Sequence, residues 1–384
     1  MTSETSTVPL IRTKLHRPQI TTDLVARPWL LEWLSQHRQR PLTLVSASAG
    51  YGKTTLISSW LESVDSPSTW LSLDEYDDDL IGFLTYFIAA IQTLFPEAGR
   101  KTQGLLNATS LPPLPVLARS LISELELLTA PFILVLDDYH FTHEAVIHDL
   151  VRELLRHPPR ALHLVIITRT DPPLSIIKLR ARSQVTEIRS EELRFTEAET
   201  ALFLQQAGLK VADTTAGDLA RKTEGWITGL RLSALSLRHR GTEVPLTGAP
   251  ENIHYITDYL LSETLSQLPS STKDFLMKTS ILDRLCGPLC DALTGRDEGE
   301  RNGQADLEWL NQQNLFIIPL DDPRQWFRYH HLFQELLRDQ LKQRLAAKDL
   351  EELHRRASTW FADHNLMNEA LRYSLAAGDV IGAA

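Results

Sequence analysis

Two patterns of apolar and polar residues alternate along the first half of the chain. Short runs dominated by apolar or β-branched residues predict buried strands over 42–45, 69–73, 132–136 and 162–168. Apolar residues at helical spacing predict helices over 24–34, 53–61, 81–94, 116–128 and 143–156. Residues 96–115, rich in Pro, Gly, Ser and Asn, are expected to form a loop. Because strands alternate with helices, about the first 190 residues are predicted to form a doubly wound α/β domain with a parallel sheet.

The pattern becomes mostly helical after Glu192. Helices are predicted over 196–206, 216–223 and 229–240, followed by a linker over 242–250. Short helices then surround a β-hairpin made by 315–320 and 326–329, an order typical of a winged helix, and 350–384 is predicted to be a helix pair. We therefore predict an N-terminal arm, an α/β domain, an all-α lid domain, a winged-helix domain and the start of a helical-repeat arm. Their predicted bounds are 1–20, 21–192, 193–250, 251–342 and 343–384.

The composition excludes several classes of protein. The 384 residues are 43% hydrophobic and 23% charged, a globular mixture long enough for several domains of roughly 100–200 residues. Acidic residues outnumber basic ones by 49 to 39, so the net charge of −10 provides no overall basic field for nucleic acid. No apolar run approaches the roughly 20 residues that cross a bilayer, and the first residues carry no secretory signal. With two cysteines in the chain, a reducing cytoplasm is the expected compartment.

A glycine-rich segment after the first predicted strand has the pattern of a phosphate-binding loop. It runs Ala47-Ser-Ala-Gly-Tyr-Gly-Lys-Thr-Thr55 and leads into a predicted helix. Its glycines allow backbone N–H groups to surround an anion, Lys53 supplies a charge for the β- and γ-phosphates, and Thr54 is a ligand for Mg²⁺. Ala47 departs from the strict pattern, which has glycine there, and is expected to cost some backbone freedom. The residues expected to bind nucleotide here are Ala49, Gly50, Tyr51, Gly52, Lys53, Thr54 and Thr55.

Polar residues at the ends of two later strands complete a predicted nucleoside triphosphate site. Asp137 and Asp138 directly follow the apolar run 132–136. We assign Asp137 to Mg²⁺, directly or through water, and Asp138 to the attacking water. Arg169 follows the next strand and is a candidate contact for the γ-phosphate, although an ordinary surface arginine remains the alternative. The acidic segment 71–79 is expected to be a solvated loop that caps a helix.

Other chemically active residues are expected to be structural. Cys286 and Cys290 have no matching pair elsewhere, and buried thiols are a simpler interpretation than a zinc site that borrows a distant histidine. His140, His143 and His148 lie on a predicted turn and helix without a cysteine or carboxylate set, so we interpret them as ordinary surface or core histidines.

The charge of the predicted winged helix disfavours DNA binding by that element. Its candidate recognition helix, 305–314, contains Asp306 and Glu308 but no Lys or Arg. The hairpin tip adds Asp321 and Asp322. A helix that enters the major groove lies beside phosphates and is expected to be basic or neutral.

In their order along the chain, these motifs resemble the N-terminal half of the MalT-like, large LuxR-type transcriptional regulators. Those regulators are signal-transduction ATPases with numerous domains (STAND), and the resemblance extends from about Thr13 to Ala384. The segments that carry it are 13–15, 24–27, 49–55, 70–74, 134–138, 168–173, 179–182, 224–230 and 327–333. The family also tolerates a residue other than glycine at the position of Ala47.

The resemblance implies a nucleotide switch with ATP or ADP and Mg²⁺ as cofactors. By analogy, Val25 and Arg27 would lie at the adenine and ribose end of the nucleotide. Residues of the lid segment that would close over the base are Gly225, Trp226 and Gly229. A winged-helix histidine would contact the β-phosphate of ADP, and either His330 or His331 is the carrier. Such proteins are closed with ADP, exchange it for ATP, self-associate, and return to the closed state by slow hydrolysis.

The resemblance also implies partners that other parts of such regulators contact. An unknown inducer would bind a downstream helical-repeat sensor, and DNA would bind a C-terminal LuxR-type helix-turn-helix. Neither part is expected within these residues, so we expect the chain to be a fragment, and no membrane partner is expected. Two alternatives remain: a motor or loader ATPase of the AAA+ type with a winged helix, and a phosphoryl-transferring P-loop kinase.

Overall fold

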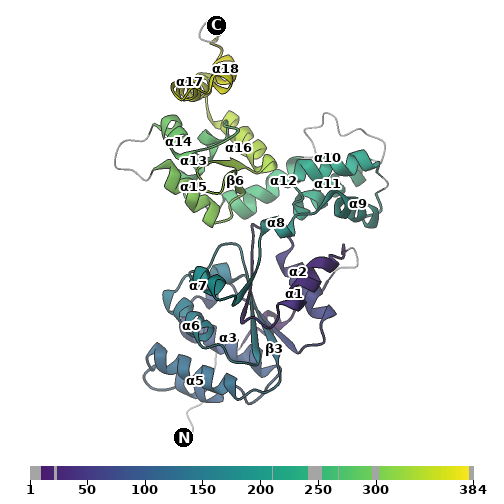
Figure 1. The fold of residues 1–384 in the computed structure, drawn as a ribbon, viewed down its shortest axis with the longest axis vertical. Helices are drawn as coiled ribbons and strands as arrows, with labels where there is room; N and C mark the ends of the chain where they lie inside the picture. Colours follow the sequence, from purple (N-terminus) through teal and green to yellow (C-terminus); the bar gives the residue numbers. More distant parts are fainter. Residues whose placement is uncertain are drawn as a thin grey trace. The chain divides into compact units, whose positions relative to one another are not determined.

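The structure is a computed structural model that describes residues 10–20, 24–209, 211–240, 253–266, 268–295 and 302–379. The predicted linker at 242–250 lies outside the described residues. The chain divides into two compact units, one within 1–47 and 51–193 and the other within 48–50 and 194–384. Figure 1 shows the sheet of the first unit and the mostly helical second unit.

A parallel sheet forms the centre of the first unit, as predicted from the alternation of strands and helices. Its strands are β1 (Leu42–Ser46), β2 (Ser68–Ser72), β3 (Phe132–Asp137), β4 (Leu162–Thr168) and β5 (Val185–Ile188). Their order in the sheet is β2-β3-β4-β1-β5, and every neighbouring pair is parallel. β1 lies between β4 and β5, with Ser46 opposite Thr168. The edge strand β5 was not predicted, because its short Val-Thr-Glu-Ile sequence lacks a continuous apolar run.

Helices cover both faces of this sheet. They are α1 (Pro28–Gln36), α2 (Lys53–Ser63), α3 (Leu80–Gln92), α4 (Arg100–Leu106), α5 (Leu114–Glu126), α6 (Ala145–Arg156), α7 (Ile176–Ala181) and the short α8 (Ser190–Leu193). Figure 1 shows α1 and α2 on one side of the sheet and α5, α6 and α7 on the other. On the latter side, alternate strand residues such as Leu44, Leu134 and Leu164 pack with the apolar faces of these helices into one fully buried core. Burial of this apolar surface is the main force that holds the layers together.

The prediction of a loop over 96–115 was wrong, because α4 lies within it. Gly99, with φ at +75°, precedes the helix. The carboxylate of Glu124, on α5, accepts hydrogen bonds from the backbone N–H groups of Lys101 and Thr102, at 2.9 and 3.0 Å. The capping group therefore comes from a residue distant in sequence, and no local capping pattern marks this helix.

The acidic segment 71–79 is only partly the solvated loop that was predicted. Asp79 caps α3 as expected, since its side chain accepts the backbone N–H of Gly82 at 2.8 Å. Asp77, however, is only 3% exposed and forms an ion pair with the buried Lys14 at 2.8 Å. Lys14 comes from a 3-10 helix, Arg12–Leu15, so the partner that allows Asp77 to be buried is remote in sequence.

Helical segments and one small hairpin form the second unit. Its helices are α9 (Glu197–Gln206), α10 (Asp213–Thr223), α11 (Ile227–Arg240), α12 (Ile253–Leu260) continued by a π-helix (Leu261–Leu265), α13 (Ser270–Thr279), α14 (Gly287–Thr294), α15 (Gly303–Gln312), α16 (His331–Arg344), α17 (Ala347–Asp363) and α18 (Met367–Ala376). The strands β6 (Ile317–Pro319) and β7 (Phe327–Tyr329) pair antiparallel between α15 and α16. This arrangement confirms the predicted helical lid, winged helix and start of a helical arm. None of the described helices is long and apolar enough to span a membrane.

Candidate nucleotide-binding site

Three predicted elements meet because β1, β4 and β3 are consecutive neighbours in the sheet. All of these strands are parallel, so their carboxyl ends lie at one edge. The glycine-rich segment follows β1, the paired aspartates end β3, and Arg169 follows β4. In open parallel sheets this edge is where ligands bind.

The glycines of the loop adopt conformations that other residues rarely tolerate. Gly50 and Gly52 have φ values of +76° and +78°, and Gly52 directly precedes α2. A Cβ atom on Gly50 would lie 2.5 Å from the hydroxyl of Thr228. Ala47 does not occur among the described residues with positive φ, so the predicted cost of alanine at that position is not seen. The loop thus forms an N–H-lined turn at the start of a helix, which suits a phosphate group.

Lys53 is held at the start of α2 with its charge largely removed from water. The side chain is 8% exposed, and Nζ donates to the carbonyl oxygen of Ala47 at 2.8 Å. Burial, aided by the positive charge of Arg169, lowers the pKa of Lys53 to about 8. A desolvated ammonium of this kind gains strongly from an anion such as a phosphate group.

The next residue, Thr54, pairs with the buried carboxylate at the end of β3. Its hydroxyl lies 3.2 and 3.1 Å from the two carboxylate oxygens of Asp137, which is only 3% exposed. Burial, with the neighbouring charge of Asp138 adding to it, raises the pKa of Asp137 to about 7. Hydroxyl and carboxylate oxygens are the ligands that Mg²⁺ prefers, and a cation would relieve the cost of ionising Asp137. The residues present therefore fit a nucleotide-bound Mg²⁺.

Asp138 and His140 are placed side by side by a tight turn. Asp138 has φ at +55°, in the left-handed region that Asp tolerates, and is 43% exposed. The Nδ1 atom of His140 lies 3.8 Å from the Asp138 carboxylate, and this buried atom makes no hydrogen bond. Burial, together with the positive charges of Arg169 and Lys53, lowers the pKa of His140 to about 3. His140 is therefore neutral at physiological pH.

The structure separates the three histidines that the sequence did not distinguish. His143 is 74% exposed beside Asp78, and His148 is a buried core residue hydrogen-bonded to Tyr139 at 3.0 Å, so both are ordinary histidines as predicted. His140 instead lies at the site. The signal that identifies it is its position two residues after the water-positioning candidate Asp138.

Arg169 is partly buried just after β4. Its positive charge contributes to the lowered pKa values of both Lys53 and His140, which shows that the guanidinium lies within electrostatic reach of these residues. The turn that carries it is closed by the hydroxyl of Thr168, which donates to the carbonyl oxygen of Thr170 at 2.7 Å. The structure thus brings Arg169 together with Lys53 and His140.

The residues assigned by analogy to the adenine and ribose end are both buried. Val25 is 3% exposed and Arg27 is 8% exposed. The guanidinium of Arg27 donates to the carbonyl oxygens of Glu192 and Leu193, both at 2.9 Å. Arg27 therefore fixes the segment that follows β5.

Within the second unit, residues 48–50 of the glycine-rich loop contact the start of α11. The indole N–H of Trp226 donates to the carbonyl oxygen of Ala49 at 3.0 Å. The hydroxyl of Thr228 donates to the carbonyl oxygen of Gly50 at 2.9 Å. Trp226 itself is fully buried, and a Cβ on Gly229 would lie 2.6 Å from its ring. Of the other loop residues, Tyr51 is buried, Gly52 and Thr54 are partly buried and Thr55 is exposed.

The two adjacent winged-helix histidines differ sharply in environment. His330 is 1% exposed, and Nε2 lies 2.9 Å from the carbonyl oxygen of Thr223, so Nδ1 is left buried without a hydrogen bond. Burial lowers the pKa of His330 to about 4. The side chain of His331 is 59% exposed and lies 3.8 Å from the carboxylate of Glu224. His330 has the unsatisfied buried atom that a ligand could satisfy.

The sheet order, the glycine-rich loop with Lys53 and the carboxylates that end β3 define a P-loop ATPase fold. A solved Walker-type ATPase of Pyrococcus abyssi shares this fold, with a TM-score of 0.59 over 84% of this chain and 98% of that chain at 15% identity. Residues 261–349 match the family of MalT winged helix domains.

The chain is similar to MalT regulators along nearly all of its 384 residues, as its motifs predicted. It is 37% identical over 374 residues to the HTH-type transcriptional regulator MalT of Klebsiella pneumoniae, covering 96% of this chain and 41% of that protein. It is also 38% identical over 377 residues to the MalT regulator of Yersinia pestis, covering 97% of this chain and 41% of that protein. The chain thus spans about two fifths of the length of these relatives.

Proposed function

We propose that the chain is the nucleotide switch of a MalT-type transcriptional regulator. It is closed with ADP, it is activated by exchange for ATP followed by self-association, and slow hydrolysis resets it. The observation that carries the proposal is the pairing of Thr54 with the buried Asp137 beside the desolvated Lys53, in a chain similar to MalT along nearly its whole length. Burial makes it costly to keep Lys53 charged and Asp137 ionised, and a bound anion and cation offset these costs.

Nucleotide binding is assigned to the loop and its flanking residues. The N–H groups around Gly50 and Gly52 and the ammonium of Lys53 bind the phosphates. Thr54 and Asp137 hold Mg²⁺, which neutralises phosphate charge when it is bound.

Hydrolysis is assigned to residues at the ends of β3 and β4. Asp138 orients the attacking water and accepts its proton, neutral His140 lies beside the Asp138 carboxylate, and Arg169 stabilises charge on the γ-phosphate. Asp138 is 43% exposed and lies beyond hydrogen-bond distance of His140. A partly solvated carboxylate is a weak base, which suits a timer rather than a rapid metabolic enzyme.

Of the two winged-helix histidines, we assign His330 to the diphosphate. Its buried Nδ1 lacks a partner, whereas His331 is exposed beside Glu224. Trp226 and Gly229 are assigned to the lid and Val25 and Arg27 to the nucleoside end, as the family resemblance implies. A diphosphate bound to several segments of the chain favours the closed state, and exchange for ATP removes that preference.

DNA binding and inducer sensing are assigned to parts of the regulator other than this winged helix. The recognition helix α15 carries Asp306 and Glu308 and no Lys or Arg. The same observation weighs against a DNA-driven motor ATPase. We place the protein in the cytoplasm because the relatives are transcriptional regulators.

A pair of substitutions tests the proposal. Lys53→Ala removes the phosphate-binding charge and is expected to weaken ADP and ATP binding by more than about 100-fold, a loss of roughly 3 kcal/mol. Asp138→Ala is expected to preserve binding and to slow single-turnover hydrolysis by at least about tenfold, because it removes the group that orients water. Lys178→Ala, at an exposed lysine of α7, is the matched control. Unchanged nucleotide affinity in the Lys53 variant would contradict the assignment of the phosphate loop.

A further inference from the structure

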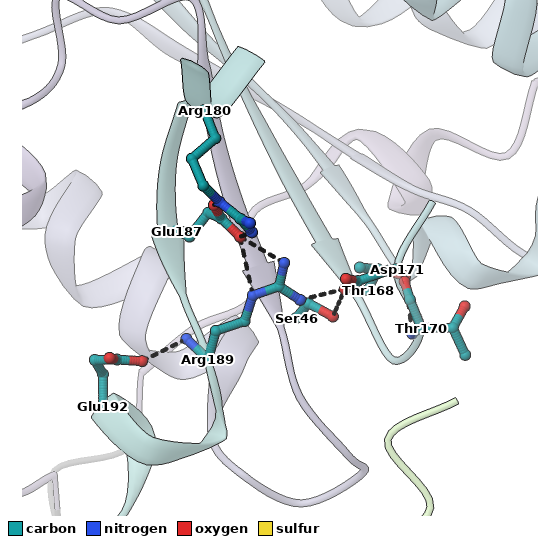
Figure 2. Close-up of polar contacts among 8 residues, drawn as sticks. All are labelled: Ser46, Thr168, Thr170, Asp171, Arg180, Glu187, Arg189 and Glu192. Carbon is teal, nitrogen blue, oxygen red and sulfur yellow. Dashed lines mark hydrogen bonds and ion pairs between the residues drawn. The ribbon is translucent and has the colours of Figure 1, made fainter. Parts of the chain in front are cut away.

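A network of polar side chains joins the carboxyl ends of β1, β4 and β5 (Figure 2). Its members are Ser46, Asp171, Arg180, Glu187 and Arg189. The hydroxyl of Ser46 donates to the Asp171 carboxylate at 2.8 Å, and the same carboxylate oxygen accepts an N–H of Arg189. None of these residues is itself assigned to nucleotide binding or hydrolysis.

Arg189 is the centre of this network because it bridges two carboxylates. Its Nη1 binds Asp171, while its Nε and Nη2 lie 3.2 and 2.6 Å from one oxygen of Glu187. Its side chain is 28% exposed. The rigid planar guanidinium can satisfy both carboxylates at once, which a lysine could not do with comparable geometry. The backbone N–H of Arg189 also binds the Glu192 carboxylate at 2.8 Å, so the residue is fixed at both its backbone and its side chain.

Asp171 connects this anchor to the site. It lies two residues after Arg169, in the turn that follows β4. Its other partner, the fully buried Ser46, ends β1 and directly precedes the phosphate loop. Figure 2 shows the Asp171 carboxylate bonded to both Ser46 and Arg189. The turn that carries Arg169 is therefore anchored through Asp171 to β1 and to the end of β5.

We propose that Arg189 acts through Asp171 as a positioning residue for hydrolysis, holding the turn after β4 so that Arg169 faces the γ-phosphate. This inference rests on the proposed function. Arg189 and Asp171 are not themselves assigned contacts with nucleotide. Their loss leaves the phosphate loop and Lys53 in place, so nucleotide affinity is retained. Hydrolysis depends on the alignment of Arg169 and is slowed, since a displacement of about 1 Å in a catalytic group can cost about 100-fold in rate.

The test uses the 384-residue chain and five variants: Arg189→Leu, Arg189→Lys, Asp171→Asn, Arg180→Leu and the double variant that combines Arg189→Leu with Asp171→Asn. Asp171→Asn preserves side-chain shape and keeps the test valid if Arg189→Leu fails to fold. Arg180, whose bidentate bonds at 2.7 and 2.9 Å go to Glu187, provides the matched control. Its substitution removes an arginine from the same carboxylate while the Arg189–Asp171 bond stays. The readouts are the single-turnover rate of ATP hydrolysis and the Kd of a fluorescent ADP analogue.

Arg189→Leu and Asp171→Asn are each expected to lower the hydrolysis rate by about 10- to 100-fold while Kd changes less than about threefold. The double variant is expected to lose no more than the larger single loss, because both substitutions act on the same Arg189–Asp171 contact. Arg189→Lys is expected to recover only part of the rate, and Arg180→Leu to remain near the parent rate.

Several results would overturn the inference. The first is a hydrolysis rate in Arg189→Leu or Asp171→Asn that equals the rate of the parent chain. The second is a loss of ADP affinity that parallels the loss of hydrolysis rate. The others are additive losses of rate in the double variant, or a loss of rate in Arg180→Leu equal to that in Arg189→Leu. A parent chain that neither binds nor hydrolyses ATP would instead contradict the proposed function itself. A hydrolysing parent with unaffected variants would contradict only the role of Arg189.

Discussion

Replacing Asp137 by asparagine is expected to stabilise the nucleotide-free protein above neutral pH. Asp137 is 3% exposed, and burial raises its pKa from the ordinary value of 3.8 to about 7. The folded protein therefore binds this proton more tightly than the unfolded chain does. Stability falls as the pH rises from about 4 to about 7, where only the folded state still holds the proton, and it stays low above that range.

The size of the effect follows from the same pKa difference. About three pKa units at roughly 1.4 kcal/mol each amount to at most about 4 kcal/mol at pH 8, because relaxation around the carboxylate reduces the cost. At pH 5.5 the corresponding cost is about 2 kcal/mol. The gain from Asp137→Asn is therefore expected to grow by up to about 2 kcal/mol between the two pH values. For a unit of roughly 190 residues this corresponds to about 4–8 °C in Tm.

Calorimetry of nucleotide-free parent and variant at pH 5.5 and pH 8 measures this gain. Asp65→Asn, at an exposed aspartate after α2, is the matched control and is expected to show no such pH-dependent gain. A variant that is less stable than the parent at pH 8, or a gain that does not grow with pH, would refute the reasoning. The variant is also expected to lose Mg²⁺-dependent retention of ATP, because a neutral amide is a poorer ligand for this ion.

Two further substitutions test the site. His140→Ala is expected to slow hydrolysis at least about tenfold with affinity retained, compared with His143→Ala at the exposed histidine, since it removes the group beside Asp138. Because the pKa of His140 is about 3, this residue should produce no inflection in the pH profile of the parent's hydrolysis rate between pH 6 and 8. An inflection in that range that is present in the parent and absent from His140→Ala would contradict the neutral state of His140. Gly50→Ala is expected to weaken ADP binding at least about tenfold, measured by fluorescence titration, because alanine is strained at a φ of +76° and its Cβ meets Thr228 at 2.5 Å. Gly104→Ala, where a Cβ meets no atom within 4 Å, is the control and is expected to leave binding unchanged; equal binding by the two variants would argue against the strained loop.

The features that the sequence predicts well depend on local patterns. The continuous apolar strands, the loop from Ala47 to Thr55 and the aspartates after β3 are each readable within a few residues. Parallel pairing then brings them to one edge of the sheet without further information. The predicted roles of Lys53 and Asp137 are supported by their burial, which sequence patterns do not measure.

The features that the sequence does not reveal depend on partners distant along the chain. Helix α4 is capped by Glu124, and the burial of Asp77 requires Lys14. The edge strand β5 has a short, mixed sequence that gains its place from pairing with β1. The same holds for Arg189, whose carboxylate partner Asp171 follows a different strand. Each of these contacts is set by tertiary packing, which overrides local propensity.

The nucleotide that accompanies the purified protein tests the central claim most directly. The chain would be purified without added nucleotide and denatured, and the released small molecules identified by chromatography and mass spectrometry. The proposed switch predicts close to one ADP per chain, because a closed state with a buried Lys53 and Asp137 retains its diphosphate. An empty site combined with rapid turnover of added ATP would contradict a regulatory switch and would favour a motor or kinase.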